Sequence, residues 1–217
     1  MSRATLARGG RGSEAGRARR LPGPELVGRV LLAAGLILLA AFAGDVALGL
    51  WQEHELDGRW RAQVAAHPPP AAADPRLIRP YPVDGVDFAI RVPKIGYLAA
   101  VAEGVDARTL AAGPGHYPDT AWPGRPGNVG VAAHNVYWIR FGDLKPGDQV
   151  MLDTRWGTYT YRVTGTRIVR PDDRTVLVQA GPPRLTLTTC WPLWAGAFAN
   201  RRLVIFTDQF DPPAAGT

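Results

Sequence analysis

A run of fifteen residues near the N-terminus, 30–44, carries no charge. As a helix it would span about 22 Å, which is short of the ~30 Å hydrocarbon core of a bilayer. An extension to residues 26–51 reaches the required length but includes Arg29 and Asp45, which would then lie near the two membrane interfaces. The sequence therefore predicts a transmembrane anchor over residues 26–51.

A cleaved signal peptide is the alternative interpretation of this segment. Residues 41–43 (Ala-Phe-Ala) fit a small-residue cleavage site. The basic region before the apolar run is long for a signal peptide, however, and the apolar character continues through residues 46–50, so an uncleaved anchor is favoured. The seven arginines in residues 1–29 place the N-terminus in the cytoplasm. Either interpretation places the remaining chain outside the cell.

The net charge of +6 belongs to the N-terminal tail and not to the rest of the chain. Residues 1–29 hold seven arginines and two glutamates, which leaves 18 basic and 17 acidic side chains in residues 30–217. A nearly neutral domain offers no basic stripe for a phosphate backbone, so nucleic-acid binding is not expected. The single cysteine, Cys190, cannot form an intramolecular disulfide. It is therefore either a buried residue without a chemical role or a reactive thiol.

Composition divides the chain into five segments. Residues 52–82 are expected to form a Pro/Ala-rich stalk, in which 53–64 could extend the helix and the proline run at 67–75 favours an extended spacer. His54 and His67 lie in this stalk and are expected to be solvated. The expected segments are a basic cytoplasmic tail (1–25), the anchor (26–51), the stalk (52–82), one folded domain (83–211) and a C-terminal tail (212–217).

The folded domain is composed of short β-like runs separated by Gly/Pro turns. Turn chemistry occurs at 113–118 and 123–128, and one brief helix is expected around 106–112. Short strands at close spacing predict an all-β domain of about eight strands, as a mostly antiparallel barrel or sandwich. The expected runs are 88–92, 97–102, 129–133, 149–152, 158–163, 166–169, 175–178, 185–190 and 203–207.

Cys190, His134 and an arginine are the residues that could carry out chemistry. A cysteine nucleophile needs a histidine that can share its proton, and acyl transfer needs a group that stabilises an oxyanion. His134 follows an apolar run, and Arg201 and Arg202 precede one. Each also has an ordinary structural interpretation. The cysteine could be a small core residue, the histidine a hydrogen-bonded structural residue, and the arginine a member of a surface ion pair. His116, within a Gly/Pro turn, is expected to pack or cap that turn.

No metal or other cofactor is expected. The two histidines of the domain and Cys190 lack the paired spacing of structural zinc sites. Residues 172–173 (Asp-Asp) indicate turn chemistry more than a calcium site.

The run Thr186 to Cys190 (TLTTC) resembles the TLxTC signature of the sortase family. The similarity extends to residues 90–96 (IRVPKIG), to 113–128 (GPGHYPDTAWPGRPGN) and to 141–148 (FGDLKPGD), in the expected order along residues 86–207. The resemblance implies a closed sortase-type barrel with one or two short helices. It is most like class D, with class E close behind.

The resemblance also implies an activity and its site residues. Cys190 matches the nucleophile, His134 the catalytic histidine and Arg202 the catalytic arginine, with Arg201 as the rival for the last position. Thr188, Thr189 and Asn135 are implied as substrate-binding or oxyanion candidates. By this analogy a thioester forms at the Thr–Gly bond of an LPxTG-like sorting signal of a secreted protein. An amine of a cell-wall precursor or a pilin then resolves the thioester, on the extracellular face of the membrane.

One departure from the family pattern, and two other protein classes, bear on this interpretation. The family usually has Gly-His-Arg around the histidine, whereas this chain has Ala133-His134-Asn135, which affects the local turn and the subclass. A papain-like peptidase would place its cysteine before its histidine, the reverse of the order here. A sortase-like scaffold without turnover would not need Cys190, His134 and Arg202 together.

Overall fold

The computed structural model of the protein describes residues 23–66 and 80–211. By its internal contacts the chain forms two units, Met1–Ala43 and Gly44–Thr217. The expected basic tail, the proline run with His67, and the expected C-terminal tail lie mostly or wholly outside the described residues. The boundary between the two units lies within the long helix α1, Pro24–Ala66.

The first unit contributes the apolar part of α1. This helix contains a stretch long and apolar enough to cross a membrane, and none of that stretch is buried. Leu38, for example, is 71% exposed. A row of such side chains in water would be unfavourable, whereas hydrocarbon solvates them, so the helix is a candidate membrane anchor.

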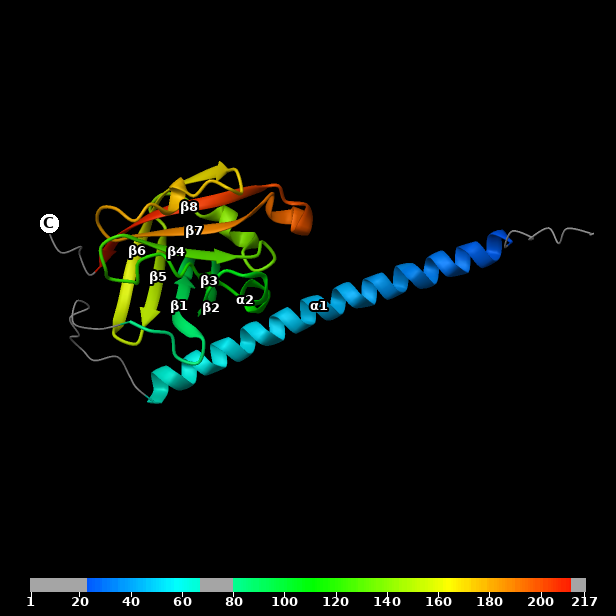
Figure 1. Ribbon diagram of the computed structural model, residues 1–217, viewed down its shortest axis with the longest axis horizontal. Helices are drawn as coiled ribbons and strands as arrows, with labels where there is room; N and C mark the ends of the chain where they lie inside the picture. Colours follow the sequence, from blue (N-terminus) through cyan, green and yellow to red (C-terminus); the bar gives the residue numbers. More distant parts are fainter. Residues whose placement is uncertain (1–22, 67–79, 212–217) are drawn as a thin grey trace, which may run out of the picture. The chain divides into compact units, whose positions relative to one another are not determined.

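The second unit is built around a closed barrel of eight strands, as predicted (Figure 1). Their order around the barrel is β1-β2-β3-β4-β7-β8-β6-β5. The strands are β1 (Val86–Val92), β2 (Tyr97–Glu103), β3 (Gly115–His116), β4 (Asn128–Ala133), β5 (Gln149–Thr154), β6 (Gly157–Val169), β7 (Arg184–Trp191) and β8 (Arg201–Asp211).

Six of the eight strand contacts are antiparallel, and two are parallel. The parallel pairs are β2 with β3 and β4 with β7. A parallel pair requires a long connection, and β4 and β7 are joined through β5 and β6. The expectation of a mostly antiparallel sheet is therefore confirmed. The longer of the two parallel exceptions is the pair of β4 with β7.

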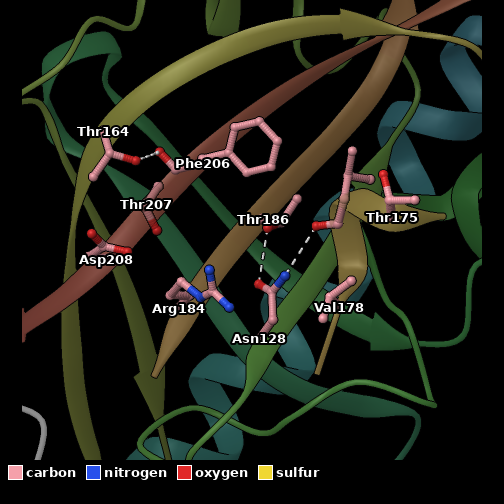
Figure 2. A pocket seen from close by; sticks show the side chains of 10 residues that line it. Asn128, Thr164, Thr175, Val178, Arg184, Thr186, Phe206, Thr207 and Asp208 are labelled. Atoms are coloured by element: carbon pink, nitrogen blue, oxygen red, sulfur yellow. Dashed lines mark hydrogen bonds between the residues drawn. The ribbon is translucent and has the colours of Figure 1, made fainter. Parts of the chain in front are cut away.

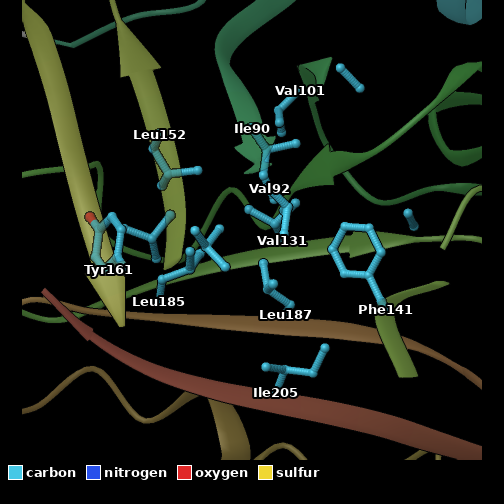
Figure 3. Close-up of a cluster of buried hydrophobic side chains, with 14 of the residues drawn as sticks. Ile90, Val92, Val101, Val131, Phe141, Leu152, Tyr161, Leu185, Leu187 and Ile205 are labelled. Carbon is cyan, nitrogen blue, oxygen red and sulfur yellow. The ribbon is translucent and has the colours of Figure 1, made fainter. Parts of the chain in front are cut away.

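Alternate residues of the strands fill the barrel interior (Figure 3). In β7, Leu185 and Leu187 are fully buried in this core, and in β4 Val129 and Val131 lie in it as well. Because successive side chains of a strand point to opposite faces, Thr186, Thr188 and Cys190 are on the outer face of β7. The periodicity thus assigns the cysteine to the outside of the barrel.

Three local expectations differ from the structure. Residues 175–178, expected as a strand, begin with the 3-10 helix η3 (Thr175–Leu177), because the Asp173 carboxylate accepts hydrogen bonds from the Thr175 amide and hydroxyl and starts a turn. The runs 158–163 and 166–169 form one strand, β6, with an irregularity at Gly165. Two residues of the expected turn at 113–118 form β3. The expected helix is present as α2 (Ala107–Ala112), capped by Asp106.

The C-terminal part of α1, within residues expected to form the stalk, packs on the barrel. Trp60 is 8% exposed and contacts Val86, Ala89 and Ala100. The Asp57 carboxylate accepts a hydrogen bond from the Ala100 amide at 2.6 Å. The helix therefore extends through residues 53–64, as expected, and it also packs on β1 and β2, because an indole and a carboxylate both have partners on the barrel. His54 is exposed.

Candidate active site

The ends of three neighbouring strands bring Cys190, His134 and Arg202 together. The parallel register of β4 and β7 pairs Ala133 with Thr189, so the residues that follow them, His134 and Cys190, are adjacent. On the other side of β7, Cys190 is directly opposite Arg202 of β8. Figure 1 shows β4, β7 and β8 side by side. Residues separated by 56 and 12 positions in the sequence thus share one place on the outer face of the barrel.

Arg202 is in direct contact with the cysteine. Its Nη1 donates a hydrogen bond to Sγ of Cys190. A guanidinium at a sulfur stabilises negative charge on that atom, which is the charge of a reactive thiolate. The neighbouring Arg201 is exposed and is opposite Trp191, so it belongs to the other face of β8. Because successive side chains of a strand point to opposite faces, the side chains of Arg201 and Arg202 lie on different faces of β8.

His134 is partly buried beside this pair. Burial lowers the pKa of its imidazole, and the positive charge of Arg202 lowers it further. Both causes favour the neutral ring at neutral pH. A neutral imidazole can accept a proton from the thiol and later return one to a leaving amine.

A cavity of about 110 Å³ opens at these residues. Cys190, His134 and Arg202 line it, together with Val105, Leu110, Tyr117, Ala132, Ala133, Thr188 and Thr189. The charged and reactive groups therefore line a small recess together with apolar side chains. A recess of this kind can hold a short side chain next to a nucleophile.

The three remaining predicted site residues are also close to this cavity, in different arrangements. The Thr188 hydroxyl is 3.1 Å from the Tyr117 hydroxyl. The Thr189 hydroxyl is buried without a hydrogen-bond partner among the described residues. The Asn135 amide donates to the Pro192 carbonyl at 3.4 Å, and thereby connects the segment after the histidine to the segment after the cysteine.

Tyr117 was not singled out by the sequence reasoning. It follows β3, lines the cavity and touches Thr188. Its neighbour His116 is fully buried, with Nδ1 2.7 Å from the carboxylate of the equally buried Asp87. The signal available in the sequence was an aromatic residue within a Gly/Pro turn, which indicates only a packed loop. The strand pairing of β3 is what places Tyr117 in the cavity.

A second cavity, of about 210 Å³, lies near the start of β4 and β7 (Figure 2). There the Asn128 side chain accepts from the Thr186 hydroxyl at 3.0 Å and donates to the Val176 carbonyl at 3.2 Å. These bonds fasten η3, between β6 and β7, to the outer face of the sheet. Cys190 does not line this cavity, so the chemistry belongs to the smaller one.

Comparisons with known proteins agree with this geometry. The family model described as the sortase domain matches residues 90–209. Sortase D of Bacillus subtilis (strain 168) is 34% identical over 119 residues, which cover 54% of this chain and 60% of that protein. The chain therefore matches less than two thirds of the length of this relative.

Solved structures show the same similarity. A Sortase D5 transpeptidase of Clostridium perfringens superposes with a TM-score of 0.54 at 26% identity, over 58% of this chain and 79% of the other. Sortase E of Streptomyces avermitilis superposes with a TM-score of 0.52 at 28% identity, over 59% and 90%. The sortase SrtA of Actinomyces oris gives 0.55 at 26% identity, over 64% and 87%.

Proposed function

Because this chain belongs to the sortase family, we propose that it is a membrane-anchored cysteine transpeptidase. It cleaves an LPxTG-like sorting signal between Thr and Gly and transfers the acyl group to an amine. The observation that supports this most directly is the meeting of His134 and Arg202 at Cys190, on the outer face of the barrel. The three groups supply a base, an anion-stabilising charge and a nucleophile at one point.

The first half of the reaction forms a thioester. Sγ of Cys190 attacks the carbonyl carbon of the Thr–Gly bond, and His134 takes the thiol proton. Negative charge develops on the carbonyl oxygen, one bond from the attacked carbon and therefore near the guanidinium of Arg202. The C–N bond then breaks, and the imidazolium gives its proton to the leaving glycine amine.

The second half uses an acceptor amine. Its nitrogen attacks the thioester carbon, His134 accepts the amine proton, and the C–S bond breaks as the imidazolium returns this proton to Sγ of Cys190. We propose an amine of a cell-wall precursor or a pilin as the acceptor. Thr188 and Thr189 are proposed to contact the peptide, and Asn135 to keep the histidine and cysteine segments in register through the Pro192 carbonyl.

We propose that the anchor in α1 holds the protein in the cell membrane with the barrel on the extracellular face. The apolar, unburied stretch of α1 and the seven arginines before its apolar core support this orientation. The partners are then secreted proteins with C-terminal sorting signals. Both substrates would be met at the membrane surface, where tethering raises their effective concentration.

The decisive experiment traps the acyl-enzyme. The full chain in detergent is incubated with a library of sorting-signal peptides, and the intact protein mass is measured. We expect a mass increase equal to the acyl fragment up to Thr, located on Cys190 by peptide mapping and lost on addition of an amine. A library that leaves the mass unchanged, while Cys190 remains open to alkylation, would contradict the proposal and indicate a scaffold without turnover.

A further inference from the structure

Four exposed apolar side chains surround the end of the barrel that carries the active site. Trp194 and Phe198, in the 3-10 helix η4 (Leu193–Phe198) after Cys190, are 82% and 91% exposed. Val136 and Ile139, in the segment after His134, are 59% and 50% exposed. We call these four side chains the apolar rim. Among the large apolar side chains of residues 80–211, the two aromatic members are the most exposed.

The two halves of the apolar rim belong to one surface. Residues 139–143 form the 3-10 helix η2 (Ile139–Asp143), which contacts η4. A Cβ added at Gly142 would lie only 2.8 Å from Cδ1 of Leu193, so the two turns are closely packed. Figure 1 shows the orange turn of η4 at the end of the barrel where β7 stops. The two turns that carry the apolar rim, one after His134 and one after Cys190, are therefore packed together beside the catalytic recess.

The helix α1 contacts the barrel in an order that leads toward this end. Trp60 packs on Val86, and Glu53 accepts a hydrogen bond from the Tyr97 hydroxyl at 3.3 Å. Farther toward the N-terminus, a cavity of about 190 Å³ is lined by four residues of α1 together with His134 and Val136; the four are Asp45, Val46, Gly49 and Leu50. The helical turns directly C-terminal to the apolar stretch thus lie against the catalytic end of the barrel, next to Val136 of the apolar rim.

No spacer separates this contact from the apolar stretch. Asp45 lines the cavity with His134, and the uncharged run 30–44 ends at the preceding residue. At a rise of about 1.5 Å per residue this run spans about 22 Å, so a hydrocarbon core of ~30 Å that holds it ends within about 8 Å of residue 45 along the helix. The catalytic end is therefore the part of the barrel that chain continuity brings to the bilayer.

We propose that the apolar rim rests in the lipid surface of the bilayer that holds α1, with Trp194 and Phe198 at the boundary between headgroups and acyl chains. Aromatic side chains favour this boundary, and burial of exposed apolar area stabilises the contact. The exposed Arg140 and Arg201 lie beside the apolar rim, where lipid phosphates would meet their charge. The inference rests on the membrane anchoring proposed above. It makes the bilayer surface a wall of the active site.

Depth measurements with spin labels test this contact. In the full chain with Cys190→Ala, which removes the only native thiol, a single cysteine is introduced by Phe198→Cys, Val178→Cys or Leu38→Cys and labelled. Each protein is placed as one copy in a nanodisc of phosphatidylcholine and phosphatidylglycerol. Val178 is the matched control, because it is 52% exposed but lines the cavity at the far end of β4 and β7. Collisions with oxygen and with a water-soluble nickel complex are then compared.

We expect the label at position 198 to collide more with oxygen than with nickel, as the label at position 38 does, and the label at position 178 to collide mainly with nickel. A label at 198 as open to nickel as the one at 178 would overturn the lipid contact while the label at 38 still reports anchoring. Exclusion of both reagents from 198 would mean that protein covers the apolar rim, and would also overturn it. A label at 38 open to nickel would overturn the anchoring itself.

Discussion

At the scale of single residues, the charge of Arg202 acts on both partners of the active site. It touches Sγ of Cys190, where a positive charge favours the thiolate, and it lowers the pKa of His134, where it favours the neutral ring. In the proposed mechanism, the same cation therefore contacts the nucleophile and keeps the base unprotonated. A surface arginine one residue away, Arg201, can do neither because its side chain is on the opposite face of β8.

Substitutions at the three residues should separate their roles. We expect Cys190→Ala to abolish thioester formation, and His134→Ala to lower turnover about 10³-fold, since proton transfer by a positioned group contributes on this order. Arg202→Ala should lower turnover about 10²-fold through the loss of oxyanion stabilisation, with the fold intact by circular dichroism. Arg201→Ala is the matched control and should turn over sorting-signal peptide like the wild type. Wild-type turnover in Cys190→Ala would refute the mechanism.

The titration of His134 tests the charge effect directly. Its pKa is expected below the ordinary value of 6.5, mainly through burial and further through Arg202. Replacement of the cation by Arg202→Gln should raise the pKa of His134 toward 6.5 without reaching it, because burial remains. Arg201→Gln should leave it unchanged. Titration of the imidazole resonances by NMR measures both, and an unchanged midpoint in Arg202→Gln would argue against the electrostatic coupling.

At the scale of elements, two contacts hold the walls of the site in place. The C-terminal part of α1 covers β1 and β2 through Trp60 and Asp57. The buried pair of His116 and Asp87 fastens β3 to β1 and thereby positions Tyr117 in the cavity. Neither contact includes a reacting group. A substitution in either one should therefore lower the stability of the fold, and should affect the reaction only through the shape of the recess.

Removal of the indole should loosen the docked helix. We expect Trp60→Ala to lower the free energy of unfolding by about 3 kcal/mol, as for other large-to-small core substitutions. Arg59→Ala is the control, because its ion pair with Glu55 is exposed and contributes little. Denaturant unfolding of a chain that begins at residue 44 measures both. Equal stabilities of the two variants would mean that the helix does not contribute to the fold.

Replacing only one member of the buried Asp87–His116 pair should lower the free energy of unfolding, because the other member then loses its partner. Nδ1 of His116 lies 2.7 Å from the Asp87 carboxylate, and its Nε2 lies 3.1 Å from both the Ala121 carbonyl and the Thr120 hydroxyl. Asp87→Asn would remove the carboxylate that pairs with Nδ1 of His116 in the interior and should lower the free energy of unfolding by about 1–3 kcal/mol, the usual cost of a lost buried hydrogen-bond partner. The double variant Asp87→Asn/His116→Gln should cost less than the sum of the single variants. Additive costs in the unfolding free energies would show that the two side chains are not coupled.

At the scale of the whole molecule, the division at Ala43 and Gly44 separates an apolar helical segment from a unit that contains the entire catalytic recess. Chemistry and anchoring are therefore properties of different parts of the chain. In the proposed function, membrane attachment determines where the protein meets its substrates, because tethering raises effective concentration without changing the reacting groups.

A chain that lacks residues 1–43 tests this separation. We expect it to unfold at the same denaturant concentration as the full chain and to form the thioester with a soluble peptide at the same rate. With a sorting-signal peptide anchored in vesicles, the full chain should react about 10²-fold faster or more, by the usual gain from tethering. Intact-protein mass spectrometry over time measures both rates. Loss of thioester formation with the soluble peptide would show that the anchor takes part in the chemistry.

The sequence by itself determined which residues could react and in what kind of fold. Short runs bounded by Gly and Pro indicated an all-β domain, as a barrel or a sandwich, and placed Cys190 at the end of the run 185–190. These are local properties, since strand periodicity and turn chemistry act over a few residues. The position of His134 after an apolar strand could be predicted in the same way.

Only the tertiary structure decided which of these elements are neighbours. The parallel pairing of β4 with β7, the insertion of β3, and the docking of Trp60 on the barrel all join residues far apart in the chain. Such contacts depend on complementary surfaces across the whole fold, and no local pattern encodes their register. For that reason the sequence did not identify Tyr117 as a lining residue of the recess, or the Asp87–His116 pair that holds the preceding strand in place.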